Sequence, residues 1–138
     1  MTPGRVRDMT TPQLYACLRY TDAERALEFA AALGFTEVLV VRNPEDPSRI
    51  EHAQFRWRDN GGIMLGSERD RVGPTVGSGC VNLVVASDED VDRVLAAALG
   101  AGGRQLNEPS HAPYGGRNVA VADPEGNVWN IDSYPGEE

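Results

Sequence analysis

The sequence contains no lysine, so all 13 of its basic residues are arginine. This absence excludes Schiff-base chemistry and the lysine of a phosphate-binding P-loop. It accompanies an abundance of alanine and glycine that is typical of a GC-rich genome. The arginine usage is therefore not in itself a functional signal.

Cysteines and long apolar runs are also scarce. The two cysteines, Cys17 and Cys80, form no CxxC pair, and no apolar run approaches the roughly 18 residues that cross a bilayer. Residues 1–11 carry two arginines and an aspartate and lack the apolar stretch of a secretion signal. These absences predict a reduced, cytoplasmic protein without a membrane partner.

The chain is short of positive charge, with 21 acidic residues and a formal net charge of -8. A nucleic acid or an anionic membrane would need a basic patch, so neither is an expected partner. The 138 residues, 41% of them hydrophobic, predict one soluble domain, 1–138, that buries a core without disulfides or metal.

The two halves of the chain repeat one pattern. Residues 21–34 and 87–100 both begin with a capping residue, Thr21 or Ser87, and both end in Leu-Gly, at a constant offset of 66 residues. Each predicts an amphipathic helix that ends at a left-handed glycine, Gly34 or Gly100. Short alternating runs predict strands at 14–20, 36–41, 51–58 and 63–66 in the first half, and at 80–85, 104–106, 117–122 and 128–134 in the second. Each half thus reads β-α-β-β-β.

Alternation gives each predicted sheet one apolar and one polar face. Phe55 and Trp57 alternate with His52 and Arg56, and Trp129 alternates with polar neighbours in the last strand. We expect an α+β fold of two modules, 13–66 and 79–134, joined by the glycine-rich loop 72–79. Two polar faces curved toward each other would form a ligand cup, while a solvated sheet face is the alternative.

Two segments carry a resemblance to a known family. They are Leu18-Arg19-Tyr20-Thr21-Asp22 leading into Leu33-Gly34-Phe35, and Asp123-Pro124-Glu125-Gly126-Asn127 leading into the last strand. With the duplicated unit, they resemble the vicinal oxygen chelate superfamily of glyoxalases, extradiol dioxygenases, and fosfomycin and bleomycin resistance proteins. Tyr114-Gly115-Gly116-Arg117 is similar to uncharacterised glyoxalase-like members. The resemblance covers about 13–134 and implies a ligand cup and a homodimer, often formed by module exchange.

The resemblance also implies four positions for metal ligands in the cup: Tyr15, Met64, Cys80 and Asn130. Family enzymes carry His, Gln or Glu there. A phenol, a thioether, a thiol and an amide neutralise little of the charge of a divalent ion. The sequence therefore predicts no metal and no other cofactor. The two histidines, His52 and His111, would rebuild a site only by converging with a distant carboxylate.

Other side chains have competing interpretations. Arg19, on the same face as Tyr15 and Cys17, is either a clamp for a carboxylate or phosphate, as in glyoxalase-like members, or half of an internal salt bridge. Tyr114 and Arg117 either close over a ligand at the mouth of the cup or anchor their loop.

Cys80 has no cation nearby in the sequence to activate it, which favours a buried structural thiol over a nucleophile. Trp57, Trp129 and Phe55 belong to the apolar face and are expected in the core rather than as ligand walls.

The leading hypothesis is metal-independent binding of a small antibiotic-like molecule or aromatic, anionic metabolite in a homodimer. An enzyme of the glyoxalase type, acting as lyase, isomerase or dioxygenase, is the alternative, and a structural or protein-binding module is a third. The expected ligand-binding residues are Tyr15, Cys17, Arg19, His52, Arg56, Met64, Cys80, Tyr114, Arg117 and Asn130.

Overall fold

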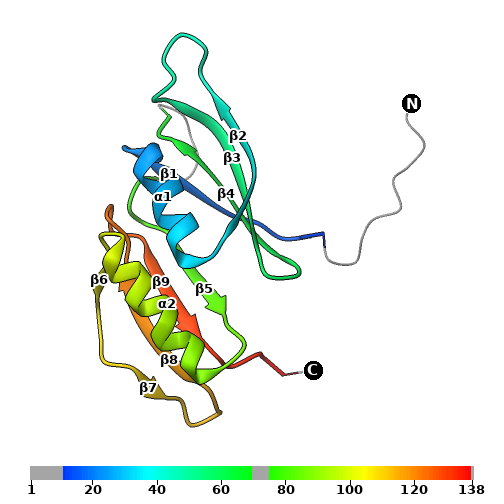
Figure 1. Ribbon diagram of the computed structural model, residues 1–138, viewed down its shortest axis with the longest axis vertical. Coiled ribbons are helices and arrows are strands. Elements are labelled where there is room, and N and C mark those ends of the chain that lie inside the picture. The colour runs from blue at the N-terminus through cyan, green and yellow to red at the C-terminus, as the bar shows by residue number, and fades with distance from the viewer. Residues whose placement is uncertain (1–10, 70–74, 138) are drawn as a thin grey trace, which may run out of the picture.

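Each half of the chain folds as one helix packed on its own sheet. The computed structural model describes residues 11–69 and 75–137. The first module contains β1 (Ala16–Tyr20), α1 (Ala23–Leu33), β2 (Thr36–Arg42), β3 (Ile50–Trp57) and β4 (Gly61–Ser67). The second contains β5 (Cys80–Val84), α2 (Asp88–Gly100), β6 (Arg104–Gln105), β7 (Ser110–His111), β8 (Arg117–Ala122) and β9 (Val128–Asp132). Figure 1 shows both helices on the same side of two curved sheets.

The two sheets have the same strand order. The first sheet runs β1-β4-β3-β2, and the second runs β5-β9-β8-β6, with the short β7 added beside β8. In each, the first strand pairs in parallel with the last, and the other pairs are antiparallel. The predicted α+β fold of two β-α-β-β-β modules is confirmed, and β7 is the one strand that the sequence pattern missed.

The helix ends differ in detail from the prediction. Ser87 caps α2, and Gly34 ends α1 with a φ of 113°, as expected. However, α1 is capped by Asp22, which accepts from the backbone of Arg25, rather than by Thr21. Helix α2 continues through Gly100, and the left-handed residue beyond it is Gly102, with a φ of 96°.

The β3–β4 turn is also shifted from residues 59–62, which separate the predicted strands 51–58 and 63–66. Trp57 pairs with Gly61, so the turn consists of Arg58, Asp59 and Asn60, and Arg58 takes a φ of 52°. Residues 72–74 of the expected linker, and residues 1–10 at the start, lie outside the described part of the chain. Among the described residues, no helix is long and apolar enough to cross a membrane.

One hydrophobic core lies between the sheets and their helices and continues from one module to the other. The ring of Phe35 lies 5.9 Å from that of Trp129 and 4.9 Å from that of Trp57. Phe55 and Trp129 are fully buried, as predicted for the apolar face. Trp57 is only partly buried, and its indole Nε1 donates to the Val84 carbonyl at 2.9 Å, which joins the two modules.

A buried carboxylate, Asp123, also joins the modules. Its Oδ2 accepts from Tyr20 Oη at 2.7 Å, Asn127 Nδ2 at 3.0 Å and Trp129 Nε1 at 3.1 Å. Its Oδ1 accepts from the backbone N–H groups of Glu125 and Asn127, each at 3.0 Å. Burial, and then the charge of Asp123, raise the pKa of Tyr20, so that the phenol remains a donor.

The rest of the turn at 123–127 also reaches across to other segments. The two carboxylate oxygens of Glu125 accept from the backbone of Thr21 at 2.6 Å and of Asp22 at 2.7 Å. Asn127 Oδ1 accepts from the Gly79 backbone at 2.8 Å. The turn therefore fixes the end of β1, the start of α1 and the entry to β5.

We predict that Asp123→Asn lowers the free energy of unfolding by about 2–4 kcal/mol, because an amide presents a donor to groups that are themselves donors. Asp59→Asn, at an exposed turn position, is the matched control and should change it by less than about 0.5 kcal/mol. Urea denaturation measures both, and equal midpoints for the two variants would contradict the role of Asp123.

Candidate functional site

Six of the ten predicted site residues gather on the face of the first sheet that points away from α1, here called the outer face. Alternate residues of three neighbouring strands point to it, while the residues between them, such as Leu18, Ala53 and Ile63, are buried on the helix side. The outward residues are Tyr15 just before β1 and Cys17 and Arg19 in it, Gly62, Met64 and Gly66 along β4, and His52, Gln54 and Arg56 along β3.

Two glycines of β4 make room for long side chains on this face. A Cβ at Gly62 would lie 2.5 Å from the ring of Tyr15, and one at Gly66 would overlap Nη1 of Arg19. Tyr15 and Arg19 therefore lie across β4 instead of standing up from the sheet. The Tyr15 hydroxyl reaches β3, where it accepts from Gln54 Nε2 at 3.1 Å.

Positive charge gathers at the Arg19 end of the outer face. Arg19 Nη1 lies 3.5 Å from the Ser67 carbonyl, Arg69 donates to the Glu51 carbonyl at 2.9 Å, and Arg49 Nε lies 3.2 Å from the Glu51 carboxylate. Burial, and then the neighbouring charges of Arg69 and Arg49, lower the pKa of Arg19. We call Arg19, Arg49, Arg69 and Glu51 the arginine corner.

The outer face of the second sheet holds two further predicted residues, Cys80 and Asn130. Asn130 on β9 lies beside Asn82 on β5. The expectation that Cys80 is a buried structural thiol is wrong, because β5 is an edge strand and Cys80 points outward from it. Both Cys17 and Cys80 are free and exposed.

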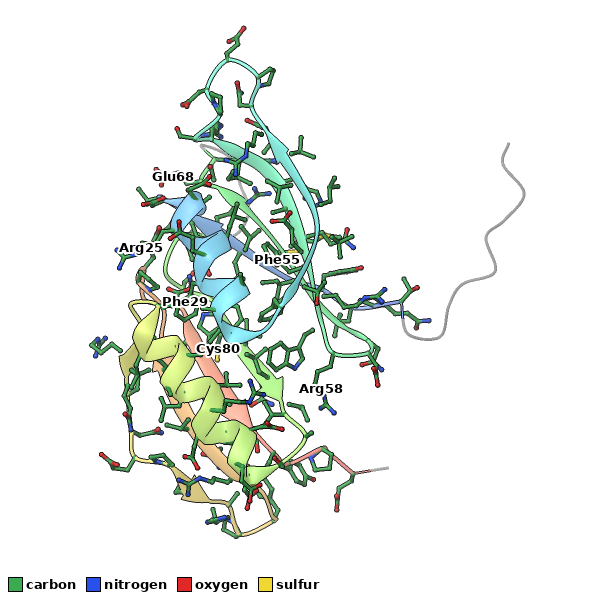
Figure 2. The ribbon with its side chains drawn as sticks, in the orientation of Figure 1. Arg25, Phe29, Phe55, Arg58, Glu68 and Cys80 are labelled. Atoms are coloured by element: carbon green, nitrogen blue, oxygen red, sulfur yellow. The ribbon has the colours of Figure 1, made fainter. Side chains whose placement is uncertain are left out.

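A groove between the modules is lined mainly by residues from the helix side of the two sheets, with a few from their outer faces. The groove has a volume of about 340 Å³ and is lined by Gly62 from β4 and by Cys80 and Asn82 from β5, with Phe35 and Trp57 on its apolar side. Figure 2 shows Cys80 at the junction of the two modules. The groove therefore opens at the Tyr15 end of the outer face, opposite the arginine corner.

Tyr114 and Arg117 do not join this site. Arg117 lies on the helix side of the second sheet and donates to Asp92 of α2 at 2.9 Å, so it anchors its strand. Tyr114 is 66% exposed and packs edge to face on Tyr134, with ring centroids 4.8 Å apart. Of the two alternatives for these side chains, closing over the cup or anchoring their loop, their positions favour anchoring.

The four positions at which family enzymes hold a metal do not suit a divalent ion here. The Tyr15 phenol is bonded to Gln54, and Met64, Cys80 and Asn130 add no imidazole or carboxylate. His111 contacts Asp88 of α2 at 3.3 Å, away from His52 on β3. Within residues 11–69 and 75–137, no group of three or more His, Cys, Asp or Glu side chains is placed to hold a metal.

Sequence reasoning missed the parts of the site that depend on neighbouring strands. Gly62 and Gly66, four residues apart in one strand, were the available signal, because glycine inside a strand marks a close approach. Arg49, Arg69 and Gln54 gave no signal of their own.

These features define a class of protein: a duplicated β-α-β-β-β fold with polar outer sheet faces and a groove between its modules. The chain belongs to the Glyoxalase/Bleomycin resistance protein/Dioxygenase superfamily, whose sequence model matches residues 13–131. A comparison with curated proteins gives no match.

Solved structures of several proteins share this fold. TioX from Micromonospora sp. ML1 is 26% identical, with a TM-score of 0.63 over 86% of this chain and 97% of that one. A glyoxalase-related enzyme from Fulvimarina pelagi is 25% identical, with a TM-score of 0.66 over 87% of each chain. The fosfomycin resistance protein FosX from Mesorhizobium loti is 13% identical, with a TM-score of 0.61 over 87% and 89%.

We predict that Gly66→Ala lowers the free energy of unfolding by about 1–3 kcal/mol, since the new methyl group meets Arg19 and lies 3.1 Å from the Ile50 carbonyl. Gly100→Ala is the matched control. A Cβ at this helical position meets nothing within 4 Å, so alanine should leave stability unchanged or raise it by up to about 1 kcal/mol. Urea denaturation compares the two, and a neutral Gly66→Ala would contradict the close packing over β4.

Proposed function

We propose that the protein binds a small, partly planar organic molecule with an anionic group on the outer face of the first sheet, without a metal ion. The observation that carries this proposal is the position of Arg19. Its guanidinium lies across Gly66, held beside the Ser67 carbonyl, at the end of a face that also presents Met64 and Tyr15.

The neighbours of Arg19 match the two halves of such a ligand. A guanidinium binds a carboxylate or phosphate through paired N–H donors, and this fixes the orientation of the ligand. Beside it, the thioether of Met64 offers a soft, polarizable surface to a planar ring. Further along the outer face, the hydrogen-bonded side chains of Tyr15 and Gln54 offer polar contacts.

The superfamily name is consistent with this class of function. The superfamily name joins resistance proteins with enzymes, and FosX is a fosfomycin resistance protein, whose 13% identity supports the fold alone. The donor set at the four metal positions supports binding without a metal, because it lacks the ligands that family enzymes use.

We predict that at least one aromatic carboxylate or anionic antibiotic raises the melting temperature, because a ligand that binds only the folded state stabilises it. Arg19→Gln should weaken the binding of that ligand by about 10- to 100-fold, the effect of one lost charge-assisted pair. Arg117→Gln is the control and should leave the affinity unchanged, since Arg117 is bonded to Asp92 on the helix side. Calorimetric titration measures these affinities, and equal losses in both variants would contradict the proposed position.

Two results would overturn the proposal that the protein binds its ligand without a metal ion and without catalysing a reaction. One is stoichiometric zinc, nickel, iron or manganese in protein purified without chelator, with affinity lost in His52→Ala. The other is turnover of glutathione hemithioacetals or catechols, which would favour the enzyme alternative.

The proposal includes a homodimer in which the second copy covers the outer face. Leu39 and Val41 of the edge strand β2 are 46% and 42% exposed, and the register places them beside Gln54 and His52 on that face. A second copy would remove these apolar groups from water and enclose the ligand.

We predict that sedimentation equilibrium finds a dimer and that Leu39→Glu shifts the protein toward monomer, because a carboxylate cannot be buried there unpaired. Leu106→Glu, at a leucine of the second module that is 39% exposed, is the control and should remain dimeric. A monomeric parent protein would contradict the dimer.

A further inference from the structure

We infer that the arginine corner is a binding site for a doubly charged oxyanion group, such as a phosphate monoester or phosphonate, on the ligand. This inference rests on the proposed function and adds the charge class of the ligand. The site is formed by Arg19 of β1, Arg49 before β3 and Arg69 after β4, around Glu51 of β3.

The three guanidiniums are held close together by different contacts. Arg69 donates to the Glu51 carbonyl at 2.9 Å, and Arg49 donates to the Glu68 carbonyl at 3.0 Å. Arg19 lies over Gly66, where an added Cβ would also be 3.2 Å from the Glu51 carbonyl. Figure 2 places Glu68 at the opposite end of the first module from Arg58, which lies in the β3–β4 turn.

The charges of the corner do not cancel. Within residues 11–69 and 75–137, Glu51 is the one carboxylate that forms an ion pair with any of the three arginines, and it pairs with Arg49. Together the three guanidiniums and the Glu51 carboxylate carry a formal charge of +2, and the neighbouring Glu68 contributes its carbonyl to Arg49 and no ion pair. The contacts of Arg19 and Arg69 go to backbone carbonyls, which carry no net charge.

Three other arginines of the described chain pair with a carboxylate, while Arg25, Arg56, Arg58 and Arg104 form no ion pair there, and none of them joins two other arginines around one carboxylate. Arg42 pairs with Glu24, Arg93 with Asp90 and Arg117 with Asp92. Like charges in close proximity repel each other, and a dianion placed between them removes that repulsion, whereas a monoanion removes only part of it.

The overall charge of -8 does not prevent this. At physiological ionic strength, exposed charges separated by more than about 8 Å are largely screened, so the groups within the corner dominate. A tetrahedral oxyanion also presents three oxygens to the N–H donors of several guanidiniums, whereas one planar guanidinium satisfies both oxygens of a carboxylate.

The experiment compares probes that share a phenyl ring. Phenyl phosphate carries two charges at about pH 8, since the second ionisation of a phosphate ester lies near pH 6. Phenylphosphonate ionises somewhat higher and is also mostly doubly charged there, while phenyl sulfate carries one charge in a nearly identical shape. In calorimetric titration, we expect both dianions to bind at least about tenfold more tightly than phenyl sulfate or benzoate. If only one of phenyl phosphate and phenylphosphonate binds tightly, the preference for a doubly charged group is still supported. The result then also shows whether the site fits a phosphate ester or a phosphonate.

Variants test whether the preference for doubly charged ligands comes from the arginine corner. Arg49→Gln and Arg69→Gln should each weaken phenyl phosphate binding by about tenfold and reduce its advantage over phenyl sulfate. Arg104→Gln, which removes an exposed arginine of the second module, should leave both affinities unchanged. Glu51→Gln should tighten phenyl phosphate binding, because it removes the one negative charge of the corner, and a structural role alone would not produce that gain.

The outcomes separate this inference from the proposed function. If phenyl sulfate and benzoate bind as tightly as phenyl phosphate and depend on Arg19, the inference is wrong and the proposed function stands. A loss of affinity in Glu51→Gln also overturns it. If none of the four probes binds, the corner is not a site for dianions, while the proposed function is decided by its own ligand screen.

Discussion

The position of the outer face depends on the buried carboxylate of Asp123. Strand β1 is an edge strand that pairs only with β4, and its last residue, Tyr20, is tied to the second module through Asp123. Arg19, the preceding residue, points to the opposite side of the same strand. Fixing Tyr20 in the core therefore also fixes Arg19 on the outer face. Burying a carboxylate is unfavourable unless it is fully bonded, and the five donors around Asp123 meet that condition.

Much of the fold could be predicted from local signals, because each module repeats them. Strand alternation placed Phe55 and Trp129 in the core, and capping chemistry placed Ser87 and Gly34 at helix ends. The predicted helix boundary is wrong where a distant segment of the chain fixes it. Glu125 binds the backbone of Thr21 and Asp22 from the other module, which no local pattern at the start of α1 could reveal.

The site was predictable only where one strand determines it. Alternation within β1 and β3 placed Tyr15, Arg19 and His52 on a common face. The same rule places Arg117 on the helix side, since it shares its parity with Val119 and Val121, both fully buried. Its place next to Gly115-Gly116 favours a loop position instead. The prediction that Cys80 is buried is wrong because an apolar strand sequence does not reveal that the strand lies at the edge of a sheet.

The arginine corner could not be predicted, since its residues lie far apart in the sequence and only the register of β1, β4 and β3 brings Arg19, Arg49 and Arg69 together. The net charge of the chain does not reveal such a local cluster, because it adds charges from the whole molecule. Screening by salt limits the effect of each exposed charge to its near neighbours.

The composition of the chain gives the corner its particular chemistry. With no lysine, every permanent side-chain cation is a planar guanidinium, which can lie flat where a compact ammonium group would remain a point charge. Lying flat across β4 requires space above that strand, and Gly66 supplies it at the cost of weaker strand propensity. The glycine and the arginine are thus two parts of one arrangement. The absence of a side chain at Gly66 also leaves room for the backbone carbonyls of Ile50 and Glu51, which an added Cβ would approach to 3.1 and 3.2 Å.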